Sequence, residues 1–442
     1  MMLDIVVKNA KVFHEGELKE LEISVKDGKI YRLSKVAPPE QADVVVDVGG
    51  KIVLPGVIDA HVHFRDPGFT SKENWYTGSC AAAGGGVTCV MDHPNTNPPT
   101  IDPKAFRKKL RRANKLSIVD FGINGGVTSN LEMLERLKEC GITAFGEIFM
   151  APSTNAEPLD NTMLRKALEK ISELSLPACI HAEDGEIILK AESRFDPTNP
   201  MYHCLTRPPE AEVEAVVKVV NMVKDLDVKL HICHISTEGG AGMVRNAKYV
   251  GMKVSCEVSP HHLLLSEDDM LRLGGMGKVN PPLRSHTHVQ KLWEYLRRGI
   301  IDIIASDHAP HRRIEKGNVF DSPPGVPGVE TMFPLMLACV KKNMIPLERV
   351  VNASSERVAN IFGIPCKGKI ERGYDADFGV YDMKCVEKVE GEKLHSKAGW
   401  SPFDGFDAVF PRLVVRRGEI IYDEREEGGI VAEKGSGRWI GE

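Results

Sequence analysis

The stretch VIDAHVHFRDPG, residues 57–68, marks the point at which the sequence pattern of the chain changes. Before it, residues 1–55 read as short strands separated by Gly, Pro and Asp-Gly turns. After it, short apolar strands alternate with longer amphipathic segments, which is the pattern of βα units and a parallel sheet. We therefore expect a second, larger unit to begin at about residue 56.

Eight strands of this kind follow one another along the chain. They lie near residues 57–62, 87–92, 117–123, 143–150, 177–183, 228–234, 252–258 and 301–307. Amphipathic helices are expected near residues 103–115, 130–140, 208–226, 285–298, 329–342 and 346–362. Eight βα units in one run predict an α/β fold, a (β/α)8 TIM-type barrel.

Strand-like sequence returns near the C-terminus. Segments KGKIERGYDADFGVYD (367–382) and FPRLVVRRGEIIYDE (410–424) are similar in pattern to the N-terminal stretch. We expect the two chain ends to pair in a small β-sandwich-like domain. This domain would comprise residues 1–55 and 366–442, beside a barrel of residues 56–365.

Composition excludes several classes of protein. The 57 Lys and Arg residues against 62 Asp and Glu give a formal net charge of −5, which argues against a mainly electrostatic hold on nucleic acid. No apolar run approaches the roughly 18 to 20 residues that a membrane span requires. Asp4 and Lys8 interrupt the first apolar stretch, so we expect a cytoplasmic protein without a signal peptide. The ten cysteines form no C-x-x-C pair and are expected to be reduced thiols.

Polar residues at the ends of the predicted strands form a set of metal ligands. His61 and His63 close the first strand, and at positions i and i+2 both imidazoles project from the same face. The other members of the set are Glu147, His181, His234 and Asp307. Six nitrogen and oxygen ligands without a thiolate predict a site for two divalent ions, zinc above all, bridged by one carboxylate.

Each histidine also has a structural alternative. A single buried histidine more often donates to a backbone carbonyl than binds a metal, and this applies to His181 and His234 taken singly. Four histidines and two carboxylates at strand ends are together hard to place in a core without a metal. His231, His261 and His262 are the strongest rivals for a ligand role.

Two further patterns receive structural interpretations. The glycine-rich stretch GSCAAAGGGVT (78–88) lacks the Gly-Lys-Ser/Thr of a phosphate loop, so we expect it to serve tight helix-to-strand packing. The basic run KKLRRANK (108–115) lies at helical spacing opposite Phe106 and Leu110. We expect it to be a solvated helix face.

The ordered set of motifs resembles the amidohydrolase superfamily and, within it, the dihydroorotase family. DAHVHFRDP (59–67) and ASDHAPHRRIEK (305–316) resemble the two signatures of that family. Further segments resemble the remaining blocks of that family and occur in the same order. They are HPNTNPP (93–99), HAED (181–184), CHIST (233–237), EVSPHHLLL (257–265), NPPLR (280–284) and PPGVPGVET (323–331). The resemblance covers essentially the whole chain.

The resemblance implies reversible hydrolysis of (S)-dihydroorotate to N-carbamoyl-L-aspartate in pyrimidine synthesis. Zinc lowers the pKa of bound water to about 7, which would supply the hydroxide that attacks the ring amide. Asp307 would ligate a metal and act first as base and then as acid. We expect the protein to bind a small-molecule substrate and neither nucleic acid nor a membrane.

Substrate recognition requires a cation, because dihydroorotate carries a carboxylate. Arg65 lies two residues after His63 and can offer it a planar pair of donors, unless it forms a salt bridge with Asp66 or Glu73. By resemblance, Asn95 and His311 would complete the carboxylate pocket. By the same resemblance, Asn280 and the backbone around Gly325 would bind the ureide edge of the ring.

Two positions depart from the family pattern. Glu147 stands where many relatives bridge their metals with a carbamylated lysine, and a carboxylate can do the same. His93 stands where these relatives commonly have Met before Pro-Asn-Thr.

Two alternatives remain open at this point. One is an allantoinase or hydantoinase, which shares the H-x-H pair and the RPPEAE segment at 207–212. The other is a catalytically silent homologue that acts as a structural partner, for instance of aspartate transcarbamoylase. The sequence also leaves homo-oligomerisation open.

Overall fold

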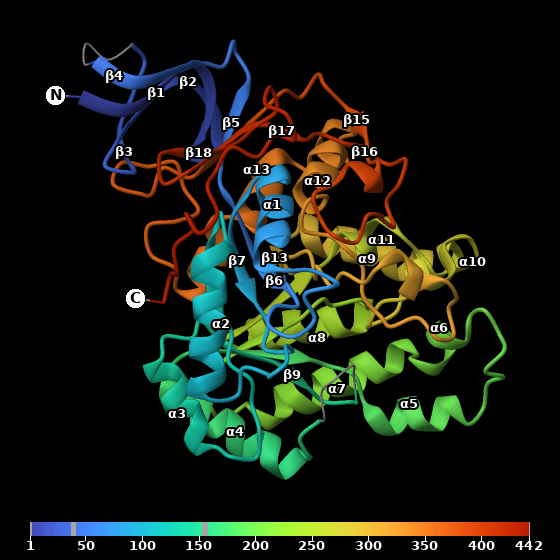
Figure 1. Cartoon of the computed structure of the whole chain (residues 1–442). Coiled ribbons are helices and arrows are strands. Elements are labelled where there is room, and N and C mark those ends of the chain that lie inside the picture. Colours follow the sequence, from blue (N-terminus) through green and yellow to red (C-terminus); the bar gives the residue numbers. More distant parts are fainter. Residues whose placement is uncertain (1, 37–40, 153–157, 442) are drawn as a thin grey trace.

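A computed structural model describes residues 2–36, 41–152 and 158–441. Its centre is a barrel of eight parallel strands (Figure 1). The strands are β6 (Val57–Val62), β7 (Val87–Asp92), β8 (Asp120–Ile123), β9 (Phe145–Phe149), β10 (Pro177–His181), β11 (Lys229–Ile232), β12 (Val254–Val258) and β13 (Ile303–Ile304). Bridges from Gly125 to Phe145 and from Val62 to His308 join the three-stranded and five-stranded sheets. The predicted barrel of eight strands in chain order is confirmed.

Helices surround the barrel, because the strands are buried along all or most of their length and need apolar cover on their outer side. Between the strands lie α1 (Trp75–Gly84), α2 (Pro103–Leu116), α3 (Glu132–Glu139), α4 (Asn161–Leu174), α5 (Gly185–Glu192), α6 (Tyr202–Thr206), α7 (Pro209–Met222), α8 (Glu238–Tyr249), α9 (Pro260–Leu264), α10 (Met270–Leu273) and α11 (His286–Arg297). After the last strand come α12 (Met332–Lys341), α13 (Leu347–Ser354) and α14 (Glu356–Phe362).

The helix expected over residues 346–362 is wrong as a single element. It is interrupted at Ser355, whose backbone (φ −142°, ψ −88°) is not helical. The Ser355 hydroxyl donates to the carbonyl of Val351 at 2.5 Å. Serine competes with the backbone for such hydrogen bonds, which is why it often interrupts helices.

The glycine-rich stretch serves packing, as expected. It runs from α1 into β7, and a Cβ added at Gly85 would lie 2.7 Å from the carbonyl oxygen of Glu330. Only glycine allows the backbones to approach this closely.

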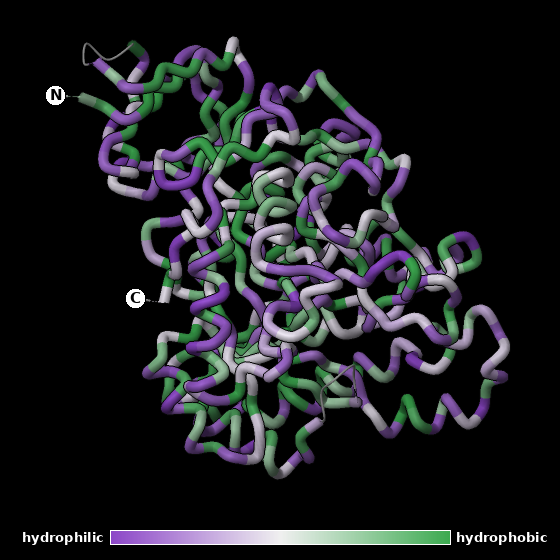
Figure 2. The backbone as a smooth tube through the Cα atoms, in the orientation of Figure 1, coloured by the Kyte–Doolittle hydropathy of each residue, from purple (hydrophilic) through white to green (hydrophobic). Residues whose placement is uncertain are grey.

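The interpretation of KKLRRANK as a solvated face is wrong for one of its basic residues. The trace of α2 is mostly hydrophilic (Figure 2), but Lys109 is fully buried. Its ammonium pairs with Asp92 and donates to the carbonyl of His93. The buried carboxylate of Asp92 at the end of β7 carries the opposite charge, which offsets the free-energy cost of removing the ammonium from water.

A second sheet brings together strands from both ends of the chain. Its strand order is β18-β17-β14-β5-β1-β2-β3, with β4 paired to β1. Its members are β1 (Met2–His14), β2 (Glu17–Lys26), β3 (Lys29–Ser34), β4 (Gln41–Asp47), β5 (Ile52–Pro55), β14 (Phe378–Tyr381), β17 (Pro411–Arg416) and β18 (Glu419–Asp423). A small ribbon of β15 (Glu387–Lys388) and β16 (Asp407–Ala408) lies apart from it.

The C-terminal tail leaves this sheet and returns to the barrel. Trp439 forms a bridge with Phe121 in β8, and its ring packs against Phe106. The division of the chain into two domains, one of residues 1–55 and 366–442 and the other of residues 56–365, stays a prediction.

In the part of the chain that the structure describes, no helix combines the length and the apolar character needed to cross a bilayer.

Candidate metal centre and substrate pocket

The end of β6 supplies a pair of imidazoles. His61 and His63 point to the same side of the strand, and their Nε2 atoms lie 3.2 Å apart. Both rings are buried, with 0% and 5% of their surface exposed. Two ring nitrogens this close, each with a lone pair to offer, are arranged as ligands of one cation.

Glu147 in β9 lies between this pair and a second pair. Its Oε1 is 2.8 Å from Nδ1 of His181 and 2.8 Å from Nε2 of His234. Its Oε2 faces the first pair, at 3.8 Å from the Nε2 atoms of both His61 and His63. One carboxylate oxygen thus faces each pair, which is the geometry that a bridge between two ions requires.

Asp307 follows the last barrel strand and completes the cluster. Its Oδ1 lies 3.4 Å from Nε2 of His63 and 3.7 Å from Nε2 of His61. Burial alone would raise the pKa of this carboxyl, but the surrounding histidines hold it below its usual range. The carboxylate is therefore available as an anionic ligand.

In three of the rings, the nitrogen that points away from the cluster contacts a side-chain oxygen. The nitrogen that points into the cluster is then free to bind a metal. Nδ1 of His61 lies 2.5 Å from Glu257, Nδ1 of His63 lies 2.7 Å from Oδ1 of Asn95, and Nε2 of His181 lies 2.8 Å from Glu183. An oxygen acceptor at one ring nitrogen fixes the proton there and leaves the lone pair on the other. The six side chains therefore fit a centre of divalent ions.

Electrostatics also favour cations at this place. Burial alone would raise the pKa of Glu147, but hydrogen bonds with His181, His234 and His61 hold it well below its usual value. Two buried carboxylates, those of Glu147 and Asp307, thus face the imidazole nitrogens as anions, which suits a doubly charged ion.

The three rival histidines have other surroundings. His231 contacts the hydroxyl of Ser255 at 2.8 Å and Glu257 at 3.1 Å. His262 donates to the carbonyl of Pro281 at 3.0 Å, and His261 lies against the His262 ring. Among the described residues, the groupings able to hold an ion at this centre do not include these three histidines. They do not include His181 either, which reaches the cluster through its contact with Glu147.

Sequence reasoning missed two supporting carboxylates, Glu257 and Glu183. Glu257 is buried in β12 and contacts both His61 and His231. A glutamate inside an otherwise apolar strand is the signal that could have found it. Glu183 follows His181 by two residues and pairs with Arg207, and the short spacing is its only signal.

Arg65 lies beside the cluster, and within residues 2–36, 41–152 and 158–441 no carboxylate forms an ion pair with it. The two candidates for a salt bridge are engaged elsewhere, because Asp66 pairs with Arg112 at 3.0 Å and Glu73 accepts a hydrogen bond from Ser396. Arg65 as a residue is 8% exposed, its Nε has no partner in the described structure, and one Nη lies 3.4 Å from Nε2 of His311. A buried cation in this state is suited to an anionic ligand.

The remaining predicted residues line or flank the same cavity. Asn95 and Asn280 both line it, and Oδ1 of Asn280 is buried without a partner in the described structure. Gly325 also lines it, but its N–H already donates to Lys278 and its carbonyl accepts from Lys316. Its carbonyl can therefore offer a ligand only its second lone pair.

Comparison with known proteins decides the family. Residues 52–408 match the description of the amidohydrolase family. The chain belongs to this family. In sequence, this amidohydrolase is 46% identical to the dihydroorotase of Methanosarcina mazei, over 99% of its own length and 98% of that protein. It is 39% identical to the dihydroorotase of Halobacterium salinarum, over 95% and 96% of the two chains.

Solved structures of hydantoinases share the fold of this amidohydrolase. The L-hydantoinase (dihydropyrimidinase) from Arthrobacter aurescens has a TM-score of 0.95 and 32% identity, with 99% of this chain and 100% of that chain covered. A D-hydantoinase has a TM-score of 0.91 and 28% identity over 99% of both chains.

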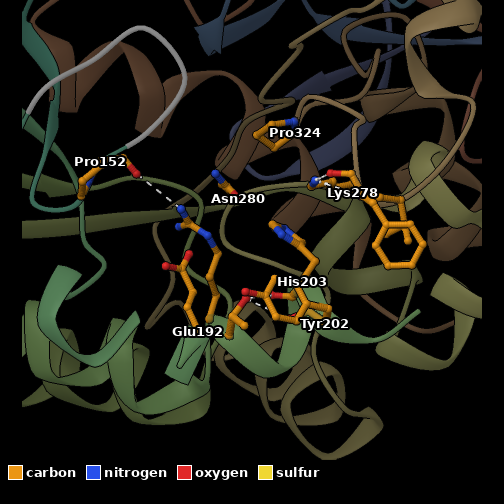
Figure 3. A pocket seen from close by; sticks show the side chains of 11 residues that line it. Pro152, Glu192, Tyr202, His203, Lys278, Asn280 and Pro324 are labelled. Carbon is orange, nitrogen blue, oxygen red and sulfur yellow. Dashed lines mark hydrogen bonds between the residues drawn. The ribbon is translucent and has the colours of Figure 1, made fainter. Parts of the chain in front are cut away.

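An outer chamber of the amidohydrolase adjoins the candidate metal centre. Its volume is about 360 Å³, and it shares Asn280 and Pro324 with the inner cavity. Figure 3 shows Asn280 among the side chains of Pro152, His203 and Lys278. The chamber therefore lies directly outside the candidate site.

The departure at His93 places a further imidazole against the centre. The His93 ring is buried, and its centroid lies 4.0 Å from that of His61. Burial, together with His61 and His63, lowers the pKa of His93 well below its usual value. The residue is therefore a neutral neighbour of His61.

Proposed function

We propose that this amidohydrolase is a dihydroorotase, which interconverts dihydroorotate and N-carbamoyl-L-aspartate. The observation that carries the proposal is the buried guanidinium of Arg65 in the same cavity as the histidine and carboxylate cluster. It is supported by the relatives named dihydroorotase, which match nearly the whole chain. Dihydroorotate combines a cyclic amide with a carboxylate, and the cavity offers a group for each.

The proposed cofactor is a pair of zinc ions. His61, His63 and Asp307 would hold one ion, His181 and His234 would hold the other, and Glu147 would lie between them. Zinc supplies a nucleophile at neutral pH and polarises a carbonyl when it is bound. We propose both the identity of the metal, zinc, and the number of ions, two per chain.

The protein side chains orient the ring. Arg65 and the amide of Asn95 bind the carboxylate, because Oδ1 of Asn95 is occupied by His63 and its NH₂ group is left to donate. Oδ1 of Asn280 accepts an N–H of the ring. These contacts hold the scissile amide in the cavity that Glu147 and Asp307 also line.

Asp307 moves the proton. Its Oδ1 faces the histidines of β6, which leaves Oδ2 to take a proton from the attacking water and pass it to the leaving ring nitrogen. The same carboxyl acts as base in the first step and as acid in the second, so the sequence also runs in reverse.

Hydrolysis of a hydantoin is the second candidate function. It is favoured by the close structural similarity to the Arthrobacter aurescens L-hydantoinase. Simple hydantoins carry no carboxylate, and a buried arginine facing such a ring would stay unpaired, which costs free energy. Hydantoinase activity is therefore the less favoured of the two functions.

The test combines metal analysis with an assay of dihydroorotate ring opening, before and after chelation. We expect about two zinc ions per chain, and activity that disappears on chelation and returns with zinc. Metal-loaded protein that opens hydantoin, allantoin or dihydrouracil faster than dihydroorotate would contradict the proposal. Folded protein that binds no metal would support the alternative of a silent scaffold.

Three expectations about its surroundings remain part of this proposal. They are a cytoplasmic location, self-association into a homo-oligomer, and association with aspartate transcarbamoylase. Light scattering of the purified protein, alone and mixed with the transcarbamoylase, tests the last two.

A further inference from the structure

Lys72 lies behind the carboxylate pocket, in the loop between β6 and α1. Its Nζ is 2.9 Å from Nδ1 of His311 and 3.0 Å from Oε1 of Glu315. Both Lys72 and Glu315 keep 22% of their side-chain surface exposed, whereas the His311 residue is 2% exposed. Lys72 thus connects the surface with the buried imidazole that flanks Arg65.

The partners of His311 determine which ring nitrogen carries the proton. An ammonium group has three donors and no acceptor, so Nδ1 of His311 must accept from Lys72. A backbone carbonyl can only accept, and that of Pro324 lies 3.0 Å from Nε2. Arg65 could donate only to an unprotonated Nε2, but its contact of 3.4 Å is longer than those of Lys72 and Pro324. The two shorter contacts therefore favour a neutral ring with its proton on Nε2.

This tautomer turns the pocket into a site with two donors. Nε2–H of His311 and an Nη of Arg65 lie 3.4 Å apart, and neither can accept from the other. The indole of Trp400 donates to the backbone carbonyl of His311 at 2.8 Å, which fixes the backbone of this residue. An anionic oxygen placed next to both donors would satisfy them together.

We propose that Lys72 is a positioning residue that holds His311 as an Nε2–H donor and thereby selects ring substrates bearing a carboxylate. The inference rests on the proposed function and adds a residue to it. Lys72 does not touch the substrate; it acts through His311 and adds a positive charge behind the pocket. A lysine that only tied down its loop would leave the ring proton of His311 where it is.

Electrostatics around the ring agree with this role. Burial, Arg65, Lys72 and Lys316 all lower the pKa of His311. The imidazole is therefore neutral at physiological pH and depends on its tautomer to be a donor at Nε2. Glu315 accepts from Lys72 and keeps the ammonium beside the ring.

The first test compares Lys72→Met with Lys72→Arg. Loss of the ammonium in Lys72→Met should raise KM for dihydroorotate about tenfold, with kcat within about twofold, because a charge-assisted contact behind the pocket is lost. Lys72→Arg keeps a charged donor and should restore most of the loss. Binding of orotate, an unsaturated ring with the same carboxylate, should weaken in parallel, whereas binding of uracil should not.

Lys397→Met is the matched control. Lys397 donates to the carbonyl of Thr70 at 2.8 Å and so supports the same loop without touching His311. This variant should keep the KM of the parent. Metal content and melting temperature should be unchanged in all three variants.

The second test reads the tautomer directly by NMR of protein labelled with ¹⁵N-histidine, with His311→Asn used for assignment. The parent should show an Nε2–H ring at His311, and Lys72→Met should show loss of that single form. A parent enzyme that does not open dihydroorotate would contradict the proposed function. An unchanged His311 spectrum, or a Lys72→Met variant with the parent's KM and orotate affinity, would contradict the inference.

Discussion

Glu147 is the residue on which the arrangement of the centre depends. Its two carboxylate oxygens face different pairs of histidines, at 2.8 Å on one side and 3.8 Å on the other. Sequence reasoning placed it in the fourth predicted strand, where it occupies the middle of β9, but it could not show that each oxygen faces a different pair. That division depends on the orientation of the side chain in the closed barrel.

We expect Glu147→Ala to lose at least one metal ion per chain, because no other carboxylate of the described cluster faces both histidine pairs. Metal analysis after gel filtration measures this. Glu186→Ala, which alters a glutamate side chain that is 86% exposed, is the control and should keep the parental content. Retention of both ions by Glu147→Ala would remove Glu147 from the ligand set.

We expect Arg65→Met to raise KM for dihydroorotate by about 10- to 100-fold, because the variant loses a charge-assisted hydrogen bond to the substrate carboxylate. Metal content should stay unchanged, because the guanidinium is not a ligand. Arg313→Met, at an exposed arginine paired with Glu392, should keep the parental KM. Loss of metal together with affinity would show that Arg65 supports the fold instead.

At the scale of the elements, the strand ends place the site. Arg65 (φ 61°), His234 (φ 29°) and Asp307 (φ 47°) all have left-handed backbone conformations just beyond β6, β11 and β13. Such conformations cost free energy for residues other than glycine, and they recur at functional sites as well as in turns. The strands thus turn sharply where their side chains enter the cavity.

Strands that are not adjacent also support each other's candidate ligands. Glu257 of β12 receives the Nδ1–H of His61 from β6, across the barrel interior. We expect Glu257→Gln to weaken metal affinity by about 10- to 100-fold, the usual effect of losing such a supporting carboxylate. Competition with a chelator measures this, and Glu294→Gln on the surface of α11 is the control. Unchanged affinity would show that the fold alone orients His61.

At the scale of the whole molecule, an ion cluster joins the barrel to the terminal sheet. The ammonium of Lys367 lies 2.7 Å from Asp120, 2.5 Å from Asp377 and 3.2 Å from Asp375, and all four side chains are at most 4% exposed. Arg417 contacts two of the same carboxylates. Residues distant in sequence thus neutralise Asp120 at the start of β8.

We expect Lys367→Met to lower the free energy of unfolding by about 3 to 5 kcal/mol, because it leaves buried carboxylates without their main cation. Lys369→Met, which removes a half-exposed pair with Glu356, should cost at most about 1 kcal/mol. Chemical denaturation of the metal-loaded protein compares the two. Equal effects would show that the arginines alone neutralise the cluster.

The sequence by itself determined the barrel and most of the candidate ligands. Strand period, helical period and chain order are local properties, and His61, His63, His181, His234 and Asp307 each close or follow an apolar strand. Where expectation failed, a contact between distant segments prevailed over the local pattern. Lys109 is buried because Asp92 lies beneath it, and no helical spacing reveals that carboxylate.

Only the tertiary structure decided the partners of the polar groups. It showed that Asp66 and Glu73 are engaged elsewhere, so that Arg65 has no carboxylate partner in the part of the chain that the structure describes, and that Lys72 faces His311. Hydrogen bonds act over about 3 Å and depend on direction. Segments such as residues 65–73 and 307–316 are far apart in the chain, so their donors and acceptors meet only when the barrel closes.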